Sequence, residues 1–566
     1  MTAMMTLALT NFATVVRAQG GGGMAFQQVQ KVFASDDESG DNFGHALQVS
    51  QDGLTMVVGA HSESTGGSWA GAAYVFTRGV PSGNWTEVVK LQASDKRHND
   101  YFGESVSTSA DGSTVVVGAS GEDTGGSSAG AAYVFTRGGG AGGGTNYTEV
   151  AKLQASDKQA GDLFGASVST SADGSTVVVA APYEDTGGSR AGATYVFTRG
   201  GGGGSSSNYT EVAKLQASDM QADDFFGSSV SMSADGSTVV VAARGESTGG
   251  THAGATYVFT RGGGTGGSSY TQVAKLQASD KQANDYFGWS VSTSADGSTV
   301  VVGARWESTG GSWAGAAYVF TRGVPSGNWT EVVKLQASDK QAYDYFGESV
   351  STSADGSTVV VGASGESTGG RYAGAAYVFT RGGGAGSGSY TEVAKLQASD
   401  KQASDYFGRS VSISGDGRTI AAGANGGDGS AAGASMLEGL DPNSEEYKQM
   451  SEMLNATGML AVPNKAPPSS SDNPGTKARD SGAAYIFAAP PPPPPPTTTI
   501  TTTTTTSTTT SPPRFPLVPP LGELPDPPPS GAFPPGVPSN APTLTGLSVA
   551  IGISTLLVCY NSASSS

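Results

Sequence analysis

The chain repeats one short unit seven times, and this repetition constrains its fold more than any other feature. The stretch DYFGESVSTSADGSTVVVGAS, residues 100–120, has near-copies along most of the 566 residues. The copies recur about every 60 residues, so each one is expected to form a single supersecondary unit of a tandem array. A Phe-Gly pair marks every copy, at Phe43-Gly44, Phe102-Gly103, Phe164-Gly165, Phe226-Gly227, Phe287-Gly288, Phe346-Gly347 and Phe407-Gly408.

Each repeat contains four predicted β-strands. In the second repeat, residues 105–109 and 114–118 flank an Asp111-Gly112 turn and predict a hairpin. Residues 131–137 and 147–154 supply two further segments rich in β-branched and aromatic side chains. A four-stranded unit repeated in this way is typical of a β-propeller, which leaves only short strand edges. The sequence therefore predicts an all-β fold, a seven-bladed β-propeller of four-stranded blades.

The two ends of the array predict how the ring closes. An isolated fourth strand, FQQVQKVFASD at residues 26–36, precedes the first repeat. The last repeat ends with its third strand, AAYIF at residues 483–487, and lacks a fourth. Pairing of these two segments would complete the seventh blade, so we expect the propeller to span residues 26–488.

The motif YFGESVS…DGSTVVVGA…AGAAYVF resembles the FG-GAP repeat of the integrin α-subunit head over residues 26–487. The Gly-Ala-Pro part is reduced mostly to Gly-Ala, with a proline only at Pro182. The resemblance implies a propeller and an adhesive or recognition function. Members of this family often carry a calcium loop with several carboxylates in the first hairpin, but the run STSADG at residues 107–112 has one. We expect no metal or cofactor there, and we interpret Asp-Gly as a turn.

The copies differ from one another mainly at one face of the predicted ring, which we call the top face. It carries the loops between second and third strands and the links between blades, whereas the Asp-Gly turns lie at the bottom. We expect a uniform scaffold that presents different side chains at its top. The varied residues are His45, Glu104, Ala166, Ser228, Trp289, Glu348 and Arg409 after Phe-Gly; His61, Ser120, Pro182, Arg244, Arg305, Ser364 and Asn425 after the second strand; and Trp69, Ser128, Arg190, His252, Trp313 and Tyr372 in the following loop.

Aromatic and basic residues gather in the fifth and sixth repeats, and we take them as candidate ligand-binding residues. Trp, Tyr and Arg carry much of the binding energy at interfaces. The alternative is drift after duplication, with these rings packed on neighbouring loops. Residues 68–96 recur letter for letter at 312–340, so Trp69 and Trp313 are copies of one event. The candidates are Trp69, Trp289, Arg305, Trp306, Trp313, Tyr343, Arg371 and Tyr372.

The seventh repeat carries an insertion at residues 425–480 on the same predicted face. Within it, DPNSEEYKQMSEMLNATG has an N-cap at Asn443 or Ser444 and apolar residues at helical spacing, including Tyr447 and Met450. The predicted helix either covers the end of the ring or acts as a lid or partner helix.

The two ends of the chain carry predicted processing signals. Residues 1–18 have the apolar middle of a secretory signal peptide, although a frayed cytosolic N-terminus is the alternative. Residues 489–543 are rich in proline and threonine and predict an O-glycosylated stalk. The apolar segment 544–560 is either a glycosylphosphatidylinositol signal, with lipid attached at Ser530, or a single transmembrane helix.

Sequons predict N-glycosylation of the bottom rim. Four of them open fourth strands and one lies in the insertion. They are Asn84, Asn146, Asn208, Asn328 and Asn455.

Composition and motifs limit the possible functions. Forty-nine acidic residues against 31 basic ones argue against a nucleic-acid partner, and the single cysteine excludes an intrachain disulfide. The four histidines lack metal-ligand spacing, no nucleophile motif is evident, and acidic pairs such as Glu122-Asp123 look like solvated turn residues, so we predict no catalytic residues. We expect a membrane-anchored, extracellular adhesion or recognition glycoprotein that binds a protein or glycan through its top loops. A structural glycoprotein of a cell coat or wall is the alternative, and an extracellular enzyme is the third.

Overall fold

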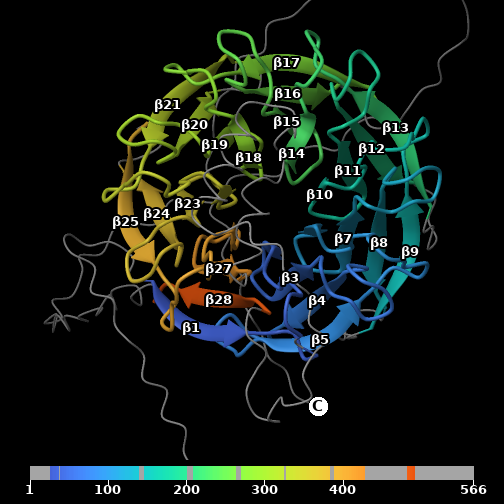
Figure 1. The fold of residues 1–566 in the computed structure, drawn as a ribbon, viewed down its shortest axis with the longest axis horizontal. Coiled ribbons are helices and arrows are strands. Elements are labelled where there is room, and N and C mark those ends of the chain that lie inside the picture. Colours follow the sequence, from blue (N-terminus) through green and yellow to red (C-terminus); the bar gives the residue numbers. More distant parts are fainter. Residues whose placement is uncertain are drawn as a thin grey trace, which may run out of the picture. The chain divides into compact units, whose positions relative to one another are not determined.

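The computed structural model describes residues 26–36, 38–138, 146–200, 208–262, 269–323, 327–382, 388–426 and 481–490. They form seven four-stranded antiparallel sheets arranged around one axis (Figure 1). The predicted all-β, seven-bladed propeller is confirmed. The signal peptide 1–18, nearly all of the insertion, the stalk from residue 491, the segment 544–560, Asn455 and Ser530 lie outside the described residues.

The first four blades follow one another along the chain. Blade one comprises β2 (Ala46–Val49), β3 (Thr55–Ala60), β4 (Ala72–Thr77) and β5 (Thr86–Leu91). Blade two comprises β6 (Ser105–Thr108), β7 (Thr114–Ala119), β8 (Ala131–Arg137) and β9 (Tyr147–Leu153). Blade three comprises β10 (Ser167–Thr170), β11 (Thr176–Ala181), β12 (Ala193–Arg199) and β13 (Tyr209–Leu215). Blade four comprises β14 (Phe226–Met232), β15 (Thr238–Ala243), β16 (Ala255–Arg261) and β17 (Tyr270–Leu276).

The remaining three blades complete the ring. Blade five comprises β18 (Phe287–Thr293), β19 (Thr299–Ala304), β20 (Ala316–Arg322) and β21 (Trp329–Leu335). Blade six comprises β22 (Ser349–Thr352), β23 (Thr358–Ala363), β24 (Ala375–Arg381) and β25 (Tyr390–Leu396). Blade seven comprises β26 (Ser410–Ile413), β27 (Thr419–Ala424), β28 (Ala483–Ala488) and, as its outer strand, β1 (Gln27–Val32).

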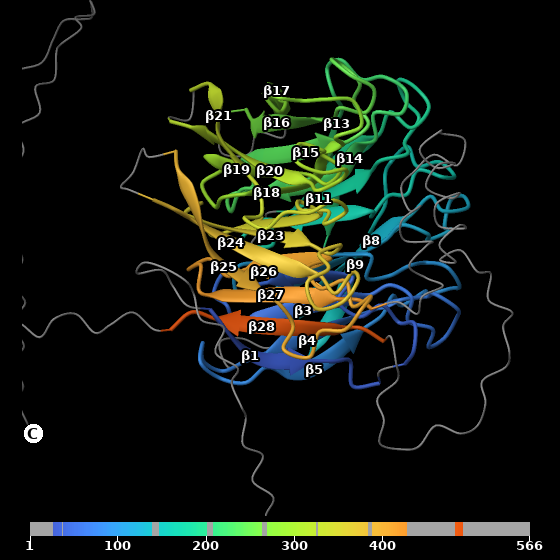
Figure 2. The same cartoon turned by 60° about the vertical axis from the view of Figure 1, so that its left-hand side comes forward.

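The first strand of each blade lies nearest the axis and the fourth lies at the rim (Figure 1). Seen from the side, the loops collect at the two ends of the strands (Figure 2). Within the described part of the chain, we find no helical segment with the length and hydrophobicity that a membrane crossing requires.

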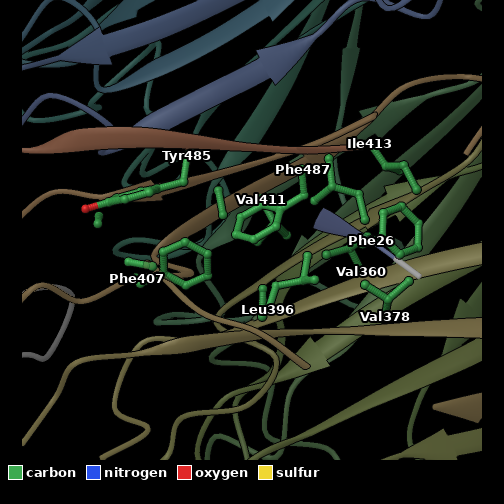
Figure 3. Packing of buried hydrophobic residues seen from close by; sticks show 14 of the residues in the cluster. Phe26, Val360, Val378, Leu396, Phe407, Val411, Ile413, Tyr485 and Phe487 are labelled. Carbon is green, nitrogen blue, oxygen red and sulfur yellow. The ribbon is translucent and has the colours of Figure 1, made fainter. Parts of the chain in front are cut away.

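The N-terminal strand closes the ring as the sequence predicts. β1 runs antiparallel to β28, with Lys31 opposite Tyr485 and Val32 opposite Ala484. Phe26 is buried in one apolar cluster with Phe487 and Leu396 (Figure 3). The first and last strands of the propeller are therefore held together by a sheet ladder and by a shared core.

The core lies between the blades. All six residues of each second strand are buried, as in β7 (TVVVGA), because neighbouring blades pack on both faces of the sheet. One cluster, for example, combines Val57 and Val75 of blade one with Val115, Val117 and Tyr133 of blade two. The second strand of each blade is therefore apolar along almost its whole length because each of its two faces packs against a neighbouring blade.

The Phe-Gly pair sits where adjacent blades approach most closely. Phe102 is fully buried and its ring centroid lies 5.6 Å from that of Tyr133 and 6.0 Å from that of Phe135. Gly103 has a φ of +95°, and a Cβ there would lie 2.2 Å from the carbonyl oxygen of Ala72 in the preceding blade. The glycine is required both by its left-handed backbone and by this contact.

A recurring ionic clasp joins each blade to the next. In blade two, Asp95 of the incoming link accepts hydrogen bonds from the Tyr133 hydroxyl at 2.7 Å and from Lys152 Nζ at 2.6 Å. Lys152 Nζ also lies 2.9 Å from Glu122 Oε1, and the Glu122 side chain is only 2 % exposed. The interpretation of Glu122 as a solvated turn residue is therefore wrong. Glu122 is buried because a lysine from the outer strand neutralises it.

A second set of link carboxyls predicts how stability depends on pH. Asp100 is buried and accepts a hydrogen bond from the Arg97 backbone N–H at 2.6 Å. Burial, and secondarily the charge of Glu122, raises the pKa of Asp100 to about 6. The carboxyls with this same raised pKa of about 6 are Asp41, Asp100, Asp162, Asp224, Asp285 and Asp344.

The fold should be more stable in mild acid than at neutral pH. Because these folded-state pKa values exceed the unfolded value, the stabilisation is complete below about pH 4 and is lost as the pH rises through about 6. The clasp aspartates reduce the stability only in stronger acid. Lys152 and Tyr133 lower the pKa of Asp95, although its burial acts to raise it, so Asp95 stays ionised in mild acid. We expect the melting temperature to be roughly 3 °C higher at about pH 5.5 than at about pH 7.5.

Thermal unfolding followed by circular dichroism at the two pH values measures this difference. The control is a variant in which all six aspartates with a raised pKa are replaced by asparagine. Its melting temperature should be nearly the same at the two pH values. A melting temperature that is equal or lower in mild acid for the unmodified chain would contradict the assignment.

Candidate functional site: a central cavity and an aromatic row

A cavity of about 480 Å³ opens on the axis at the top face. We call it the central cavity. Eleven of its lining residues occupy two of the varied positions of the repeats, namely the position after Phe-Gly and the position after the second strand. The residues that differ between copies therefore point toward the axis and lie together. The lining residues are His45, His61, Tyr101, Glu104, Ser120, Leu163, Ala166, Pro182, Tyr183, Ser228, Arg244, Trp289, Arg305 and Arg409.

The strands explain why these positions converge. The residue after Phe-Gly lies at the top end of the innermost strand, as Trp289 does near the start of β18. The residue after the second strand follows that strand at the same end of the blade, as Arg305 follows β19. Blades one to five place both positions at the cavity and blade seven places Arg409 there, so the ring brings side chains from widely separated repeats into one cavity.

Two arginines flank one tryptophan on the wall formed by blades four and five. The guanidinium carbons of Arg244 and Arg305 each lie 4.7 Å from the centroid of the Trp289 ring. Arg305 also lies 4.5 Å from the Tyr345 ring. Cation–π contacts of this kind hold a guanidinium in place while its N–H groups stay able to bind an acceptor.

Glu348 sets the electrostatics behind this wall. It is buried, it accepts hydrogen bonds from Ser364 and Arg409, and its Oε1 lies 3.6 Å from Arg305 Nη1. Burial acts to raise the pKa of Glu348, but the charges of Arg305 and Arg409 outweigh it and lower the pKa. Glu348 is therefore ionised at neutral pH and fixes two arginines.

Two histidines form the opposite part of the wall. The rings of His45 and His61 lie 4.1 Å apart, and His61 lies 6.1 Å from the Tyr101 ring. Burial, with the nearby His61 and Arg409, lowers the pKa of His45 well below 6.5. His45 is thus neutral at neutral pH.

From the cavity, aromatic rings continue outward along blade five to blade six. Trp289 stacks on Trp306 with centroids 6.2 Å apart, Trp306 stacks on Trp313 at 5.3 Å, and the Trp313 ring meets that of Tyr343 edge-on at 5.3 Å. We call these four residues the aromatic row. Trp306 is 3 % exposed and Tyr343 is 38 % exposed, so the row is buried in its middle and opens to solvent at its outer end.

The backbone holds the outer ring of the row in a strained conformation. Trp313 has a φ of 55°, and the equivalent loop residues of five other blades are also left-handed. Such a conformation costs a residue with a side chain roughly 1 kcal/mol. Hydrogen bonds offset it here, since the Trp313 N–H donates to Ser308 and its carbonyl accepts from Tyr345 of the next blade. These hydrogen bonds therefore hold the loop, and with it the Trp313 side chain, in one conformation.

The structure does not bring all predicted ligand-binding residues together. Arg305 lines the central cavity and lies beside the aromatic row. Arg371 and Tyr372 belong to the next loop, where Tyr372 is 6 % exposed and stacks on Tyr406 at 5.8 Å. Trp69 is on blade one, 51 % exposed, and stacks on Tyr101 at 6.1 Å.

Sequence reasoning missed several residues of the site. Tyr101 and Leu163 precede Phe-Gly, in a position that is aromatic in five of the seven repeats, and both line the central cavity. Both have left-handed backbones, with φ values of 55° and 56°. From the sequence, an aromatic residue beside Phe-Gly is expected to be part of the hydrophobic core. Its position at the cavity becomes evident only from the left-handed backbone conformation in the structure.

The Asp-Gly turns do not fit the calcium ion that the family resemblance implies. Asp111 Oδ1 accepts hydrogen bonds from the Ser109 hydroxyl at 2.8 Å and from the Ser113 N–H at 2.9 Å. The single carboxylate of the turn is thus used for hydrogen bonds within the turn itself. At the positions where calcium would need further acidic ligands, the chain has Ser107 and Ser109. Among the described residues, no group of three or more His, Cys, Asp or Glu side chains is arranged to hold a metal ion.

The predicted glycosylation sites lie at the other end of the strands. All four sequon asparagines that the structure describes are exposed, just before the outer strand of a blade. They are Asn84, Asn146, Asn208 and Asn328.

Comparison with known proteins identifies the repeat. The model of the FG-GAP repeat matches residues 26–76, 85–135, 147–197, 209–259, 270–320, 329–379 and 390–436. Each match begins at an outer strand, as the ring closure predicts. No curated protein matches the chain.

The solved structures that match the chain share little sequence with it. Kuenenia stuttgartiensis hydrazine synthase is 12% identical, with a TM-score of 0.42, over 69% of this chain and 95% of that one. A putative 6-phosphogluconolactonase of Bacteroides fragilis is 12% identical, with a TM-score of 0.41, over 64% and 86%. The Cps50 (Swd1) β-propeller domain of Myceliophteria thermophila is 9% identical, with a TM-score of 0.42, over 69% and 95%.

Proposed function

The chain belongs to the FG-GAP repeat family, and from this premise we propose that it is an adhesion or recognition protein whose top face binds an extracellular protein or glycan. The observation that carries the proposal is the convergence of varied residues on one face. Eleven of them line the central cavity, and the aromatic row leads from that cavity to the rim. A purely mechanical repeat has no need to vary its residues at one shared cavity while it keeps its strands constant.

The aromatic row supplies the contact surface in this proposal. Trp313 and Tyr343 expose ring surface at the outer end, where a ligand would gain both buried apolar area and stacking. Trp306 acts as support, because it is buried between Trp289 and Trp313. Rigid aromatic anchors backed by a packed layer are typical of residues that dominate an interface.

The proposal also includes the location of the protein. The expected signal peptide at 1–18, the stalk at 489–543 and the apolar segment 544–560 favour a glycoprotein held at the cell surface by its C-terminus. The four exposed sequons at the bottom rim agree with a binding face at the top. We propose no catalytic role, because the buried carboxylates Glu122 and Glu348 are each neutralised by a fixed cation.

A structural glycoprotein of a cell coat is the second candidate. The observation that favours it is the burial of Trp306, Arg305 and Tyr372, which shows that part of the predicted site packs within the propeller itself. The two functions differ in whether the top face has a saturable ligand.

Binding of the labelled full-length chain to intact cells and to extracellular matrix distinguishes the two functions. We expect saturable binding that a Trp313→Ala/Tyr343→Ala variant weakens at least ~10-fold, as expected for hot-spot residues. Trp69→Ala is the matched comparison, because it removes the same residue from an identical 29-residue segment with the same φ of 55°. It should have a much smaller effect, since Trp69 is not part of the aromatic row.

The outcomes of this experiment separate the candidates. Equal binding by the wild type and the double variant would show that the aromatic row is not the site. Absence of saturable binding by the wild type would favour the structural coat. Thermal melting of all three proteins checks that they are folded.

A further inference from the structure

The central cavity has a charge that differs from that of the rest of the protein. The chain as a whole has a net charge of −18. The cavity lining nevertheless contains three arginines, Arg244, Arg305 and Arg409, against one glutamate, Glu104, and the ionised Glu348 behind the wall offsets one more positive charge, so the net charge here is still positive. Its two histidines add no opposing charge. An anion therefore finds a more favourable environment in this cavity than over the acidic surface around it.

One of the arginines is incompletely satisfied. Arg305 is 4 % exposed and its Nε has no hydrogen-bond partner among the described residues. Its contact with Glu348, at 3.6 Å from Nη1, is longer than a hydrogen bond. A buried guanidinium with unused donors is costly, so an acceptor entering the cavity beside it would be stabilised.

The neighbouring groups hold Arg305 ready for such an acceptor. Trp289 and Tyr345 fix its guanidinium plane from two directions, and Arg244 lies against the same Trp289 ring. Two guanidinium groups anchored on one indole make a fork suited to a carboxylate, which accepts paired N–H donors. The low exposure of this wall strengthens the charge interaction.

The rest of the cavity suits a ligand that carries hydroxyl groups. Ser120, Ser228, Tyr101 and Tyr183 contribute hydroxyls from three different blades, and Glu104 adds an acceptor. At about 480 Å³, the cavity lies within the range that takes a small organic ligand. Ser120 donates to Glu104 and Ser228 donates to backbone carbonyl oxygens, but hydroxyl and carboxylate oxygens can accept further hydrogen bonds from sugar hydroxyls. A lone acidic side chain of a peptide would reach the arginines but would fill only a small part of the cavity.

We infer that the central cavity binds an acidic sugar, with its carboxylate between Arg244 and Arg305 and its hydroxyls toward the polar wall. This inference rests on the proposed function and names the chemistry of its ligand. The sugar would be a uronic acid or a sialic acid at an accessible end of a glycan. Further sugar units would then follow the aromatic row toward Trp313 and Tyr343.

Calorimetric titration of the full-length chain with free D-glucuronate and with free N-acetylneuraminate tests the inference. We expect at least one of them to bind, and its methyl ester and D-glucose to bind at least ~10-fold more weakly, because they lack the charge. Arg305→Gln should weaken binding of the acid at least ~10-fold, and Arg305→Lys should retain part of it, because it keeps the charge but loses the fork. Arg190→Gln is the control. It removes an arginine from the same face, paired with Asp223 in an outer loop, and should leave binding unchanged.

The remaining outcomes overturn the inference. Binding of neither acid by the wild type contradicts it, as does equal binding of glucose. Equal or tighter binding of acetate, or of a short glutamate-rich peptide, would show that the site takes a carboxylate without a sugar. If Arg305→Gln does not fold, Arg244→Gln gives the same test from the other side of Trp289. Saturable binding to cells together with no acidic-sugar binding would leave the proposed function standing and remove only this inference.

Discussion

Replacing Gly103 with alanine is expected to destabilise the propeller by ~4 kcal/mol or more. The added Cβ would lie 2.2 Å from the Ala72 carbonyl oxygen and 3.2 Å from the Ala60 nitrogen, and both atoms belong to the backbone of the preceding blade. A backbone cannot swing aside as a flexible side chain does, so the two blades must separate. The φ of +95° adds a further cost for any residue with a side chain.

Urea denaturation of wild type, Gly103→Ala and Gly79→Ala measures this effect. Gly79 is the matched control, because a Cβ at that position would meet no atom within 4 Å. We expect Gly79→Ala to unfold at nearly the wild-type midpoint and Gly103→Ala to unfold far below it or not to fold. Equal midpoints for the two variants would show that the Phe-Gly glycine does not fix the spacing of the blades.

Deleting residues 26–36 is expected to have a larger effect still. The deletion removes β1, which leaves the backbone of β28 unpaired along its outer edge. It also removes buried Phe26, Val32 and Ala34, and the contact of Lys31 Nζ with Asp400 at 2.7 Å. Loss of the two larger side chains alone costs ~4 kcal/mol. An open ring with a free edge should also associate with other chains.

A peptide of sequence FQQVQKVFASD should reverse this loss. Added in trans, it can rebuild the ladder with β28 and refill the core around Phe487, so the truncated chain should melt at a higher temperature and associate less with other chains. A peptide with Val32→Asp is the control and should not rescue. A truncated chain that melts like the wild type would contradict closure of the ring by its N-terminal strand.

Much of the fold follows from local pattern alone. The strand 131–137 was predicted and observed with the same bounds, because its β-branched and aromatic residues are buried on both faces. The closure of the ring was also predictable, since one end of the array lacks the strand that the other end has in excess. Seven near-identical copies remove the usual ambiguity of short apolar runs.

The site was less predictable because it depends on contacts between distant repeats. The sequence identifies Arg305 and Trp289 as varied residues but does not show that they face one cavity with His45 and Arg409. Trp306 was predicted as a binding residue, yet stacking between Trp289 and Trp313 buries it. Glu122 was predicted as solvated because its partner Lys152 lies thirty residues away on the outer strand.

In the proposed function the top face, and not the bottom, contacts the ligand. The most direct test attaches a bulky polyethylene glycol to one engineered cysteine at either end of blade five, in a Cys559→Ser background. Ser312→Cys lies at the top beside Trp313 and Asn328→Cys lies at the bottom, and both positions are exposed. We predict that the polymer at residue 312 abolishes saturable binding to cells and matrix while the polymer at residue 328 leaves it unchanged. Loss of binding only with the polymer at residue 328 would show that the ligand contacts the bottom face and not the top.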